Sequence, residues 1–187
     1  MESRRRVLFL DVDGVLMLFH RRGEWNESCL LQLKRILTEL HPLELVLSSN
    51  WKRSEESMQK LVAQFKRLCF PGWEEASVTD LQVTPELEYE TSVAHSRVRE
   101  IEEWLRRAKE EKPLVSSHSG ASHCDIAWVA VDDMNLEEAD GNVMKGHFVR
   151  TGREEGLVES KADKVLELFL QQQHQQETTA STVILEE

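Results

Sequence analysis

The apolar residues of this chain follow two patterns, short continuous runs and longer stretches at helical spacing. The continuous runs, which are typical of buried strands, lie within residues 6–11, 43–50 and 126–133, and residues 146–151 could form a last strand. The stretches in which apolar residues recur every three or four positions lie at residues 28–40, 54–68, 101–108 and 160–170. Strands that alternate with helices usually form a parallel sheet covered on both faces. We therefore predict a three-layer, Rossmann-like α/β domain with a central parallel sheet.

The pattern also gives helix starts and a domain boundary. Candidate caps lie at Asn26 or Ser28, at Ser54, and at Ser160 with Asp163. After residue 170 the chain becomes polar and rich in Gln, Thr and Ser, a composition that cannot bury a core. We expect one domain over residues 5–170 and a disordered C-terminal tail over residues 171–187.

Polar residues follow three of the predicted strands directly. They are Asp11 and Asp13, Ser48 and Ser49, and Asp132 and Asp133. In open α/β sheets ligands bind at the carboxyl ends of the strands, near the point where the strand order switches. We expect the three strand ends to converge on one crevice, with Gly14 allowing the chain to turn away from the first strand.

Two other interpretations of the acids are weaker. A calcium-binding loop needs oxygen ligands at alternating positions between two helices, but Val15 replaces a ligand here and a strand precedes the motif. Helix caps and turn residues explain a single Asp after a strand. They do not explain two acidic pairs and one Ser pair at three strand ends.

Four motifs, in this order, resemble those of the haloacid dehalogenase-like (HAD) phosphohydrolase superfamily. They are "FLDVDGVL", "VLSSNW", Arg97 in "SRVREIEEWL", and "VAVDDM". Together with "HFVRTGREEGLV", they look most like the HAD domain associated with Swiss Army Knife RNA repair proteins, and this resemblance covers residues 5 to about 170. It implies a HAD-like fold and a phosphatase that forms an aspartyl-phosphate.

The resemblance gives the residues their expected roles. Asp11 would be the nucleophile, and Asp13 would protonate the leaving oxygen and then take a proton from water. The expected phosphate ligands are Ser48 or Ser49 and Arg97, with Arg99 and Lys109 as alternatives to Arg97. The expected Mg²⁺ ligands are Asp11, the backbone carbonyl of Asp13 and Asp132, with Asp133 as a ligand through water or as an orienting residue.

The short connections predict an open cleft without a large cap domain. Residues 17–25 leave room only for a hairpin-like flap, in which His20, Arg21 and Arg22 could meet a phosphorylated substrate. An open cleft suits a large substrate, and the resemblance favours RNA or another polynucleotide end. The alternatives are a phosphatase for phosphoproteins, nucleotides or small metabolites, and a phosphate-binding module without turnover. We expect Trp51 to pack the second helix against the sheet, with stacking on a base as the alternative.

Composition bears on the cellular compartment and the partners of the protein more than on its reaction. A formal net charge of −11 argues mildly against a nucleic-acid partner. The three cysteines have no CxxC spacing, and no signal peptide or membrane-spanning run of about 20 apolar residues is present, so we expect a cytoplasmic or nuclear protein without a membrane partner. His118, His123 and Cys124 match no zinc signature, and we expect an inserted polar loop there.

Overall fold

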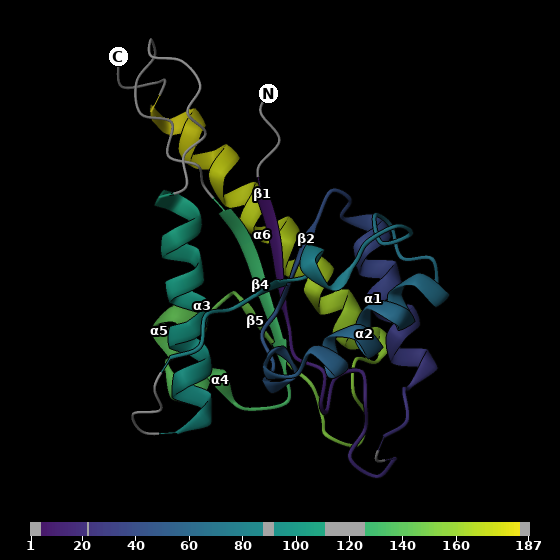
Figure 1. The fold of residues 1–187 in the computed structure, drawn as a ribbon. Coiled ribbons are helices and arrows are strands. Elements are labelled where there is room, and N and C mark those ends of the chain that lie inside the picture. The colour runs from purple at the N-terminus through teal and green to yellow at the C-terminus, as the bar shows by residue number, and fades with distance from the viewer. Residues whose placement is uncertain (1–4, 22, 88–91, 111–125, 184–187) are drawn as a thin grey trace.

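A computed structural model describes residues 5–21, 23–87, 92–110 and 126–183, with side chains to residue 175 in the last range. Five strands in these ranges form one parallel sheet (Figure 1). In spatial order they are β3 (Gln82–Val83), β2 (Glu44–Leu47), β1 (Arg5–Leu10), β4 (Ile126–Asp132) and β5 (Phe148–Arg150). The strand order switches between β1 and β4, where a ligand crevice is expected in an open α/β sheet.

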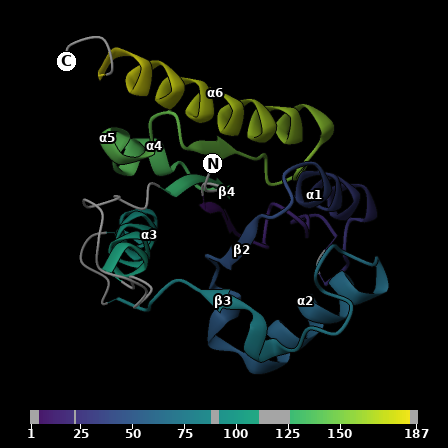
Figure 2. The same cartoon turned by 90° about the horizontal axis from the view of Figure 1, so that it is seen from above.

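Helices cover both faces of this sheet, which confirms the predicted three-layer architecture (Figure 2). One face carries α1 (Glu27–Glu39), α2 (Glu55–Arg67) and α6 (Glu159–Val183). The other carries α3 (Val93–Glu110), α4 (Leu136–Ala139) and α5 (Gly141–Met144). Two short 3₁₀ turns, Asn50–Arg53 and Val78–Asp80, lie between β2 and β3.

Alternation along β1 explains why each face has its own core. Leu8 and Leu10 are buried toward α1, α2 and α6, whereas Phe9 is buried on the face of α3. The Phe9 ring packs edge-on against Trp104 and Trp128, with ring centroids 5.3 and 5.8 Å away. Continuous apolar strands of this kind are expected where a parallel sheet is covered on both sides.

Two predicted helix caps are confirmed and one is wrong. The side chain of Asn26 accepts a hydrogen bond from the Cys29 N–H, and that of Ser54 accepts one from the Ser57 N–H. Helix α6 begins at Glu159, one residue before Ser160, so Ser160 lies inside the helix instead of capping it.

The C-terminal helix also runs further than expected, because α6 continues beyond residue 170 to Val183. Gln172 is buried: its side-chain oxygen accepts from the Trp128 N–H at 3.1 Å, and its amide donates to the Trp128 carbonyl at 2.9 Å. Strand β5 begins at Phe148, opposite Ala130, and so does not reach Trp128. The structure has a helix where we expected a disordered tail from residue 171. In this helix, Gln172 forms hydrogen bonds with the Trp128 backbone, which has no partner residue in β5.

The connection between β1 and α1 is short and forms the expected flap. Met17 pairs in antiparallel fashion with Trp25. Both hydrophobic clusters of the described residues pack on the one sheet, so the described part of the chain contains no cap domain with its own core. Among the helices that the structure describes, none is both long and apolar enough to cross a bilayer.

Candidate active site

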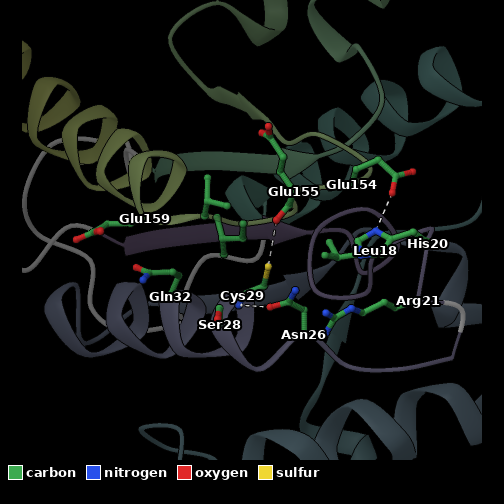
Figure 3. A pocket seen from close by; sticks show the side chains of 12 residues that line it. Leu18, His20, Arg21, Asn26, Ser28, Cys29, Gln32, Glu154, Glu155 and Glu159 are labelled. Carbon is green, nitrogen blue, oxygen red and sulfur yellow. Dashed lines mark hydrogen bonds and ion pairs between the residues drawn. The ribbon is translucent and has the colours of Figure 1, made fainter.

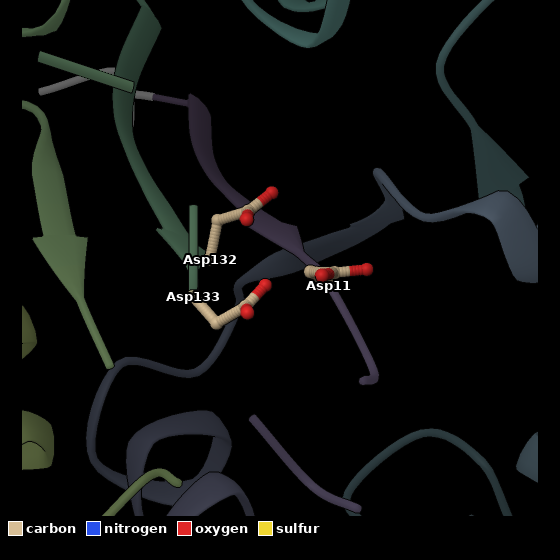
Figure 4. Close-up of side chains that lie close together, drawn as sticks. All are labelled: Asp11, Asp132 and Asp133. Atoms are coloured by element: carbon tan, nitrogen blue, oxygen red, sulfur yellow. The ribbon is translucent and has the colours of Figure 1, made fainter. Parts of the chain in front are cut away.

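Three buried aspartates meet at the ends of the two central strands. Leu10 pairs with Val131, and the Asp11 N–H donates to the Val131 carbonyl at 3.0 Å, so Asp11 and Asp132 lie side by side. A carboxylate oxygen from each of Asp11, Asp132 and Asp133 lies within 4.8 Å of the others (Figure 4). The structure thus brings together three of the acids that the sequence placed at one crevice.

Glycine at position 14 allows the turn after β1 to lie against the end of β4. Gly14 has φ +72°, and a Cβ added there would lie 2.6 Å from the Asp133 Cβ. The Thr151 hydroxyl donates to the Gly14 carbonyl at 2.8 Å and fixes the turn from the other side. A larger residue at position 14 would push Asp133 away from the other two acids.

Burial makes this cluster costly to ionise. Desolvation raises the pKa of Asp11 from its ordinary 3.8 to about 6, although Arg97 and a hydrogen bond from the Ser49 side chain act to lower it. Burial, followed by the charge of Asp11, raises the pKa of Asp132 well above its usual range. A cation held between these carboxylates would offset part of this cost of ionisation.

The charge balance of the buried residues fits a divalent cation. In the part of the chain that the structure describes, the buried charged residues are Asp11, Asp132, Asp133, Glu100, Arg97 and Lys52. Four carboxylates and two basic groups leave a charge of −2 when all are ionised, and the exposed Arg153 offsets one of these charges at Asp133. Carboxylate oxygens are ligands that hard divalent cations prefer, so both the donor set and the charge suit one such ion.

Arg97 reaches the acids from α3. Its Nη1 lies 3.5 Å from an Asp11 oxygen and 3.5 Å from an Asp132 oxygen, and its side chain is buried. Arg99 and Lys109, the alternatives from the sequence, are exposed on the same helix. Of the three candidates, only Arg97 lies at the crevice.

A buried ion pair behind Arg97 was not predicted. The Glu100 carboxylate lies 3.9 Å from the Arg97 Nε and accepts a hydrogen bond from the Lys52 Nζ at 2.7 Å. Lys52 also donates to the Thr84 hydroxyl at 3.0 Å and to the Pro85 carbonyl at 3.2 Å. Glu100, three residues after Arg97, was a sequence signal for a helical pair, but nothing in the sequence linked Lys52 to it.

Two buried donors at the crevice make no hydrogen bond within the described residues, the Ser48 hydroxyl and the Arg97 Nη1, whose contacts with the Asp11 and Asp132 oxygens are ion pairs at 3.5 Å. Ser48 lies beside Asp11 in the sheet, because the Ser48 N–H donates to the Leu10 carbonyl at 2.8 Å. Buried polar groups in native proteins are almost always satisfied, so two unsatisfied donors indicate a place for an acceptor from outside the chain. Ser49 faces Asp11 instead, and its hydroxyl also accepts from the Trp51 N–H at 3.4 Å.

Asp13 differs from the other acids, because its side chain is exposed and is held by Trp51. The Trp51 Nε1 donates to the Asp13 Oδ2 at 3.0 Å. The Trp51 ring is half-buried against the core, as expected from the sequence, and packs edge-on to Trp25 with centroids 5.3 Å apart. The hydrogen bond to Asp13 was not predicted, since it joins residues 38 positions apart.

One wall of the crevice is built from the flap and the loop between β5 and α6. The Phe19 N–H donates to the Arg153 carbonyl at 3.1 Å, and the Leu157 N–H donates to the Val15 carbonyl at 2.9 Å. Gly156, with φ +69°, allows this approach, because an added Cβ would lie 2.7 Å from the Val15 carbonyl oxygen. The Arg153 Nε donates to the Asp133 Oδ2 at 2.7 Å, which connects the wall to the acids.

A cavity of about 440 Å³ lies on another side of the flap (Figure 3). His20 and Arg21 line it together with Glu154, whose carboxylate lies 2.7 Å from the His20 Nδ1, and none of the four aspartates lines it. His20 and Arg21, two of the flap residues that could have met the substrate, thus face this cavity. Arg22 and the loop with His118, His123 and Cys124 lie outside the described residues.

Comparison with known proteins places these residues in one family. Residues 7–162 match the family described as the HAD domain in Swiss Army Knife RNA repair proteins, and the match covers every site residue named above. Searches of curated proteins and of solved structures found no match to the chain.

Proposed function

The chain belongs to the family of HAD domains in Swiss Army Knife RNA repair proteins, and on this premise we propose that it is a Mg²⁺-dependent phosphatase that removes a phosphate from a polynucleotide end. The observation that carries the proposal is the pair of unsatisfied buried donors, the Ser48 hydroxyl and the Arg97 Nη1, at the edge of the sheet where Asp11 lies. A phosphate offers acceptor oxygens for both donors, and Asp11 offers a nucleophile.

Asp11 and Asp13 divide the chemistry between them. An Asp11 oxygen attacks phosphorus, the bond from phosphorus to the leaving oxygen breaks, and Asp13 gives that oxygen its proton. In the second half, water attacks the aspartyl-phosphate, Asp13 accepts a proton from the water, and the bond from phosphorus to Asp11 breaks. The net reaction consumes one water and releases an alcohol and phosphate.

Trp51 is suited to hold Asp13 for both halves. Its N–H occupies the Asp13 Oδ2, which leaves Oδ1 to carry the proton. Without this bond the Asp13 side chain, which is exposed, would be free to rotate away from the leaving oxygen. Arg97 is in turn held by Glu100, which Lys52 keeps in place.

Asp11, the Asp13 backbone carbonyl and Asp132 would hold Mg²⁺, with Asp133 as a ligand through water or as an orienting residue. The bound ion would supply positive charge between the carboxylates and the phosphate oxygens, which otherwise repel each other. This assignment is supported by the charge of −2 among the buried residues and by the pKa of Asp11, which burial raises to about 6.

The open side of the crevice supports a large substrate. Asp13 is exposed, and the flap between Met17 and Trp25 is too short to enclose a small molecule. A polymer end can enter such a site with only its terminal phosphate buried.

A phosphate-release screen tests this proposal. Single-stranded oligonucleotides with a 3′- or a 5′-phosphate, phosphopeptides, nucleotides and sugar phosphates are compared at equal concentration, in Mg²⁺ and in EDTA, with Asp11→Asn as the inactive control. We expect the highest kcat/KM on a phosphorylated end, with no release in EDTA or by the variant. Faster hydrolysis of a phosphopeptide or a metabolite would refute the polynucleotide substrate. Tight binding of a phosphorylated end without release by the wild type would instead indicate a binding module.

A further inference from the structure

We infer that Phe19 and Arg153 form the binding site for the leaving group of the substrate, and that this leaving group is a nucleoside whose base stacks on the pair. We call these two side chains the Phe19–Arg153 platform. The inference rests on the proposed phosphatase function and adds the chemistry that the enzyme recognises beyond the phosphate.

The platform lies directly beside the acids. The Arg153 Nε donates to the Asp133 Oδ2 at 2.7 Å, and an Asp133 oxygen lies within 4.8 Å of an Asp11 oxygen. The Arg153 guanidinium carbon lies 5.1 Å from the centre of the Phe19 ring. A group attached to a phosphate on Asp11 therefore has this ring and this guanidinium within its reach.

Both side chains are open to solvent although their backbones are fixed. Phe19 is 43% exposed, and the other large apolar side chains that are exposed within the described residues are aliphatic. The Arg153 side chain is 62% exposed. An exposed apolar residue is ordinary by itself. This one is held by a hydrogen bond from its N–H to the Arg153 carbonyl, in a wall that Gly156 closes against the chain at Val15. Such a surface loses little freedom when a ligand covers it.

The chemistry of the platform favours a base over other leaving groups. Aromatic rings and guanidinium planes bind unstacked bases of single strands by stacking, and a guanidinium also binds phosphate oxygens. The described part of the chain provides no hydrogen-bond acceptor for the two terminal nitrogens of Arg153, so they are available for a neighbouring phosphate. Phosphoserine, phosphothreonine and sugar phosphates have no aromatic ring to stack on Phe19. Phosphotyrosine has one, and it belongs in the test.

The test compares leaving groups that differ in one feature. We measure kcat/KM in Mg²⁺ for a short single strand with a 3′-phosphate, the same strand with an abasic terminal residue, glycerol phosphate, and a phosphotyrosine peptide. We expect the wild type to prefer the intact strand over the abasic strand by about tenfold to a hundredfold, the range that one base–aromatic stack gives. This comparison needs no variant, so it stands even if a substituted protein fails to fold.

Variants then assign the preference to the platform. Phe19→Leu keeps an apolar side chain without a ring, and it should bring the ratio of intact to abasic strand close to one. Arg153→Gln should lower kcat/KM on both strands. Leu31→Ala and Arg106→Gln alter an exposed apolar and an exposed basic side chain on α1 and α3, and they should keep the wild-type ratio.

The outcomes separate this inference from the proposed function. Equal rates on intact and abasic strands, or an unchanged ratio in Phe19→Leu, overturn the platform while a polynucleotide phosphatase stands. A phosphotyrosine peptide that is hydrolysed faster than the strands and depends on Phe19 overturns the nucleoside as the leaving group. Hydrolysis of glycerol phosphate alone removes the polynucleotide substrate itself, and the platform with it.

Discussion

The variant Asp11→Asn should be more stable than the wild type at neutral pH without metal. Burial raises the pKa of Asp11 from 3.8 to about 6, and at about 1.4 kcal/mol per pKa unit this corresponds to about 3 kcal/mol against the ionised form. This figure already includes the attraction of Arg97, which acts to lower the pKa, and an amide of the same shape removes the remaining cost. We therefore expect a gain in the free energy of unfolding of up to about 3 kcal/mol.

The gain should depend on pH in a defined direction. Below pH 3.8 Asp11 is protonated in both the folded and the unfolded protein, and its pKa difference has no effect on relative stability. As the pH rises through the window from 3.8 to about 6, the unfolded state ionises first, and the folded wild type loses stability. Asp11→Asn has no such group, so its advantage should grow across this window and level off above it.

Urea unfolding in EDTA, followed by tryptophan fluorescence at pH 4.5 and at pH 7.5, measures this difference. Asp13→Asn is the matched control, because Asp13 belongs to the same motif but is exposed, and it should give no gain at pH 7.5. An advantage of Asp11→Asn that is equal at both pH values, or a loss of stability at pH 7.5, would refute the reasoning. Full phosphate release by the folded variant would remove Asp11 from its role as nucleophile.

Three further predictions test other parts of the site. Mg²⁺ should raise the Tm of the wild type, because a ligand that binds only the folded state stabilises it, and Asp132→Ala should lose most of that rise; an equal rise in both would place the ion elsewhere. Trp51→Phe keeps the ring but not the N–H that holds Asp13, so kcat/KM should fall at least about tenfold on alkyl phosphates and less on an aryl phosphate with a good leaving group, whereas an equal fall on both would point to a structural role. Activity on a 3′-phosphorylated strand should depend weakly on salt, with a slope of about −1 to −2 in log kcat/KM against log salt, and a steeper slope would indicate contacts with many more phosphates.

The sheet and the acid cluster were predictable because both depend on local pattern. A buried strand followed by polar residues places those residues at the carboxyl edge of a parallel sheet, whatever the rest of the fold. Asp11 and Asp132 were predicted as site residues because each follows a recognisable apolar strand. The register of β1 with β4 brings the two residues together. Strand β3 was not predicted, because its two residues are exposed and do not form an apolar run.

The supporting contacts were not predictable, because they join charged or polar residues far apart in sequence. Lys52 resembles a surface residue in the sequence, and only the packing of α3 brings Glu100 to it. Gln172 lies in a polar tract, yet it completes the hydrogen bonds of Trp128, 44 residues away. The burial of Lys52 and of Gln172 thus depends on a partner far away in the sequence, and not on the residues next to them in the chain.

The acids lie at the strand ends and Phe19 lies in the wall, and this separation bears on how specificity for the leaving group can arise. The acids are held by the register of β1 with β4 and by the contact of Gly14 with Asp133, and neither involves the Phe19 side chain. The wall is held by backbone hydrogen bonds from Phe19 to Arg153 and from Leu157 to Val15, and these do not depend on which side chains point outward. The side chain at position 19 can therefore change the leaving group that is accepted while the nucleophile stays in place. Because Arg153 also bonds Asp133, a change there reaches the acids, whereas a change at Phe19 acts on the leaving group alone.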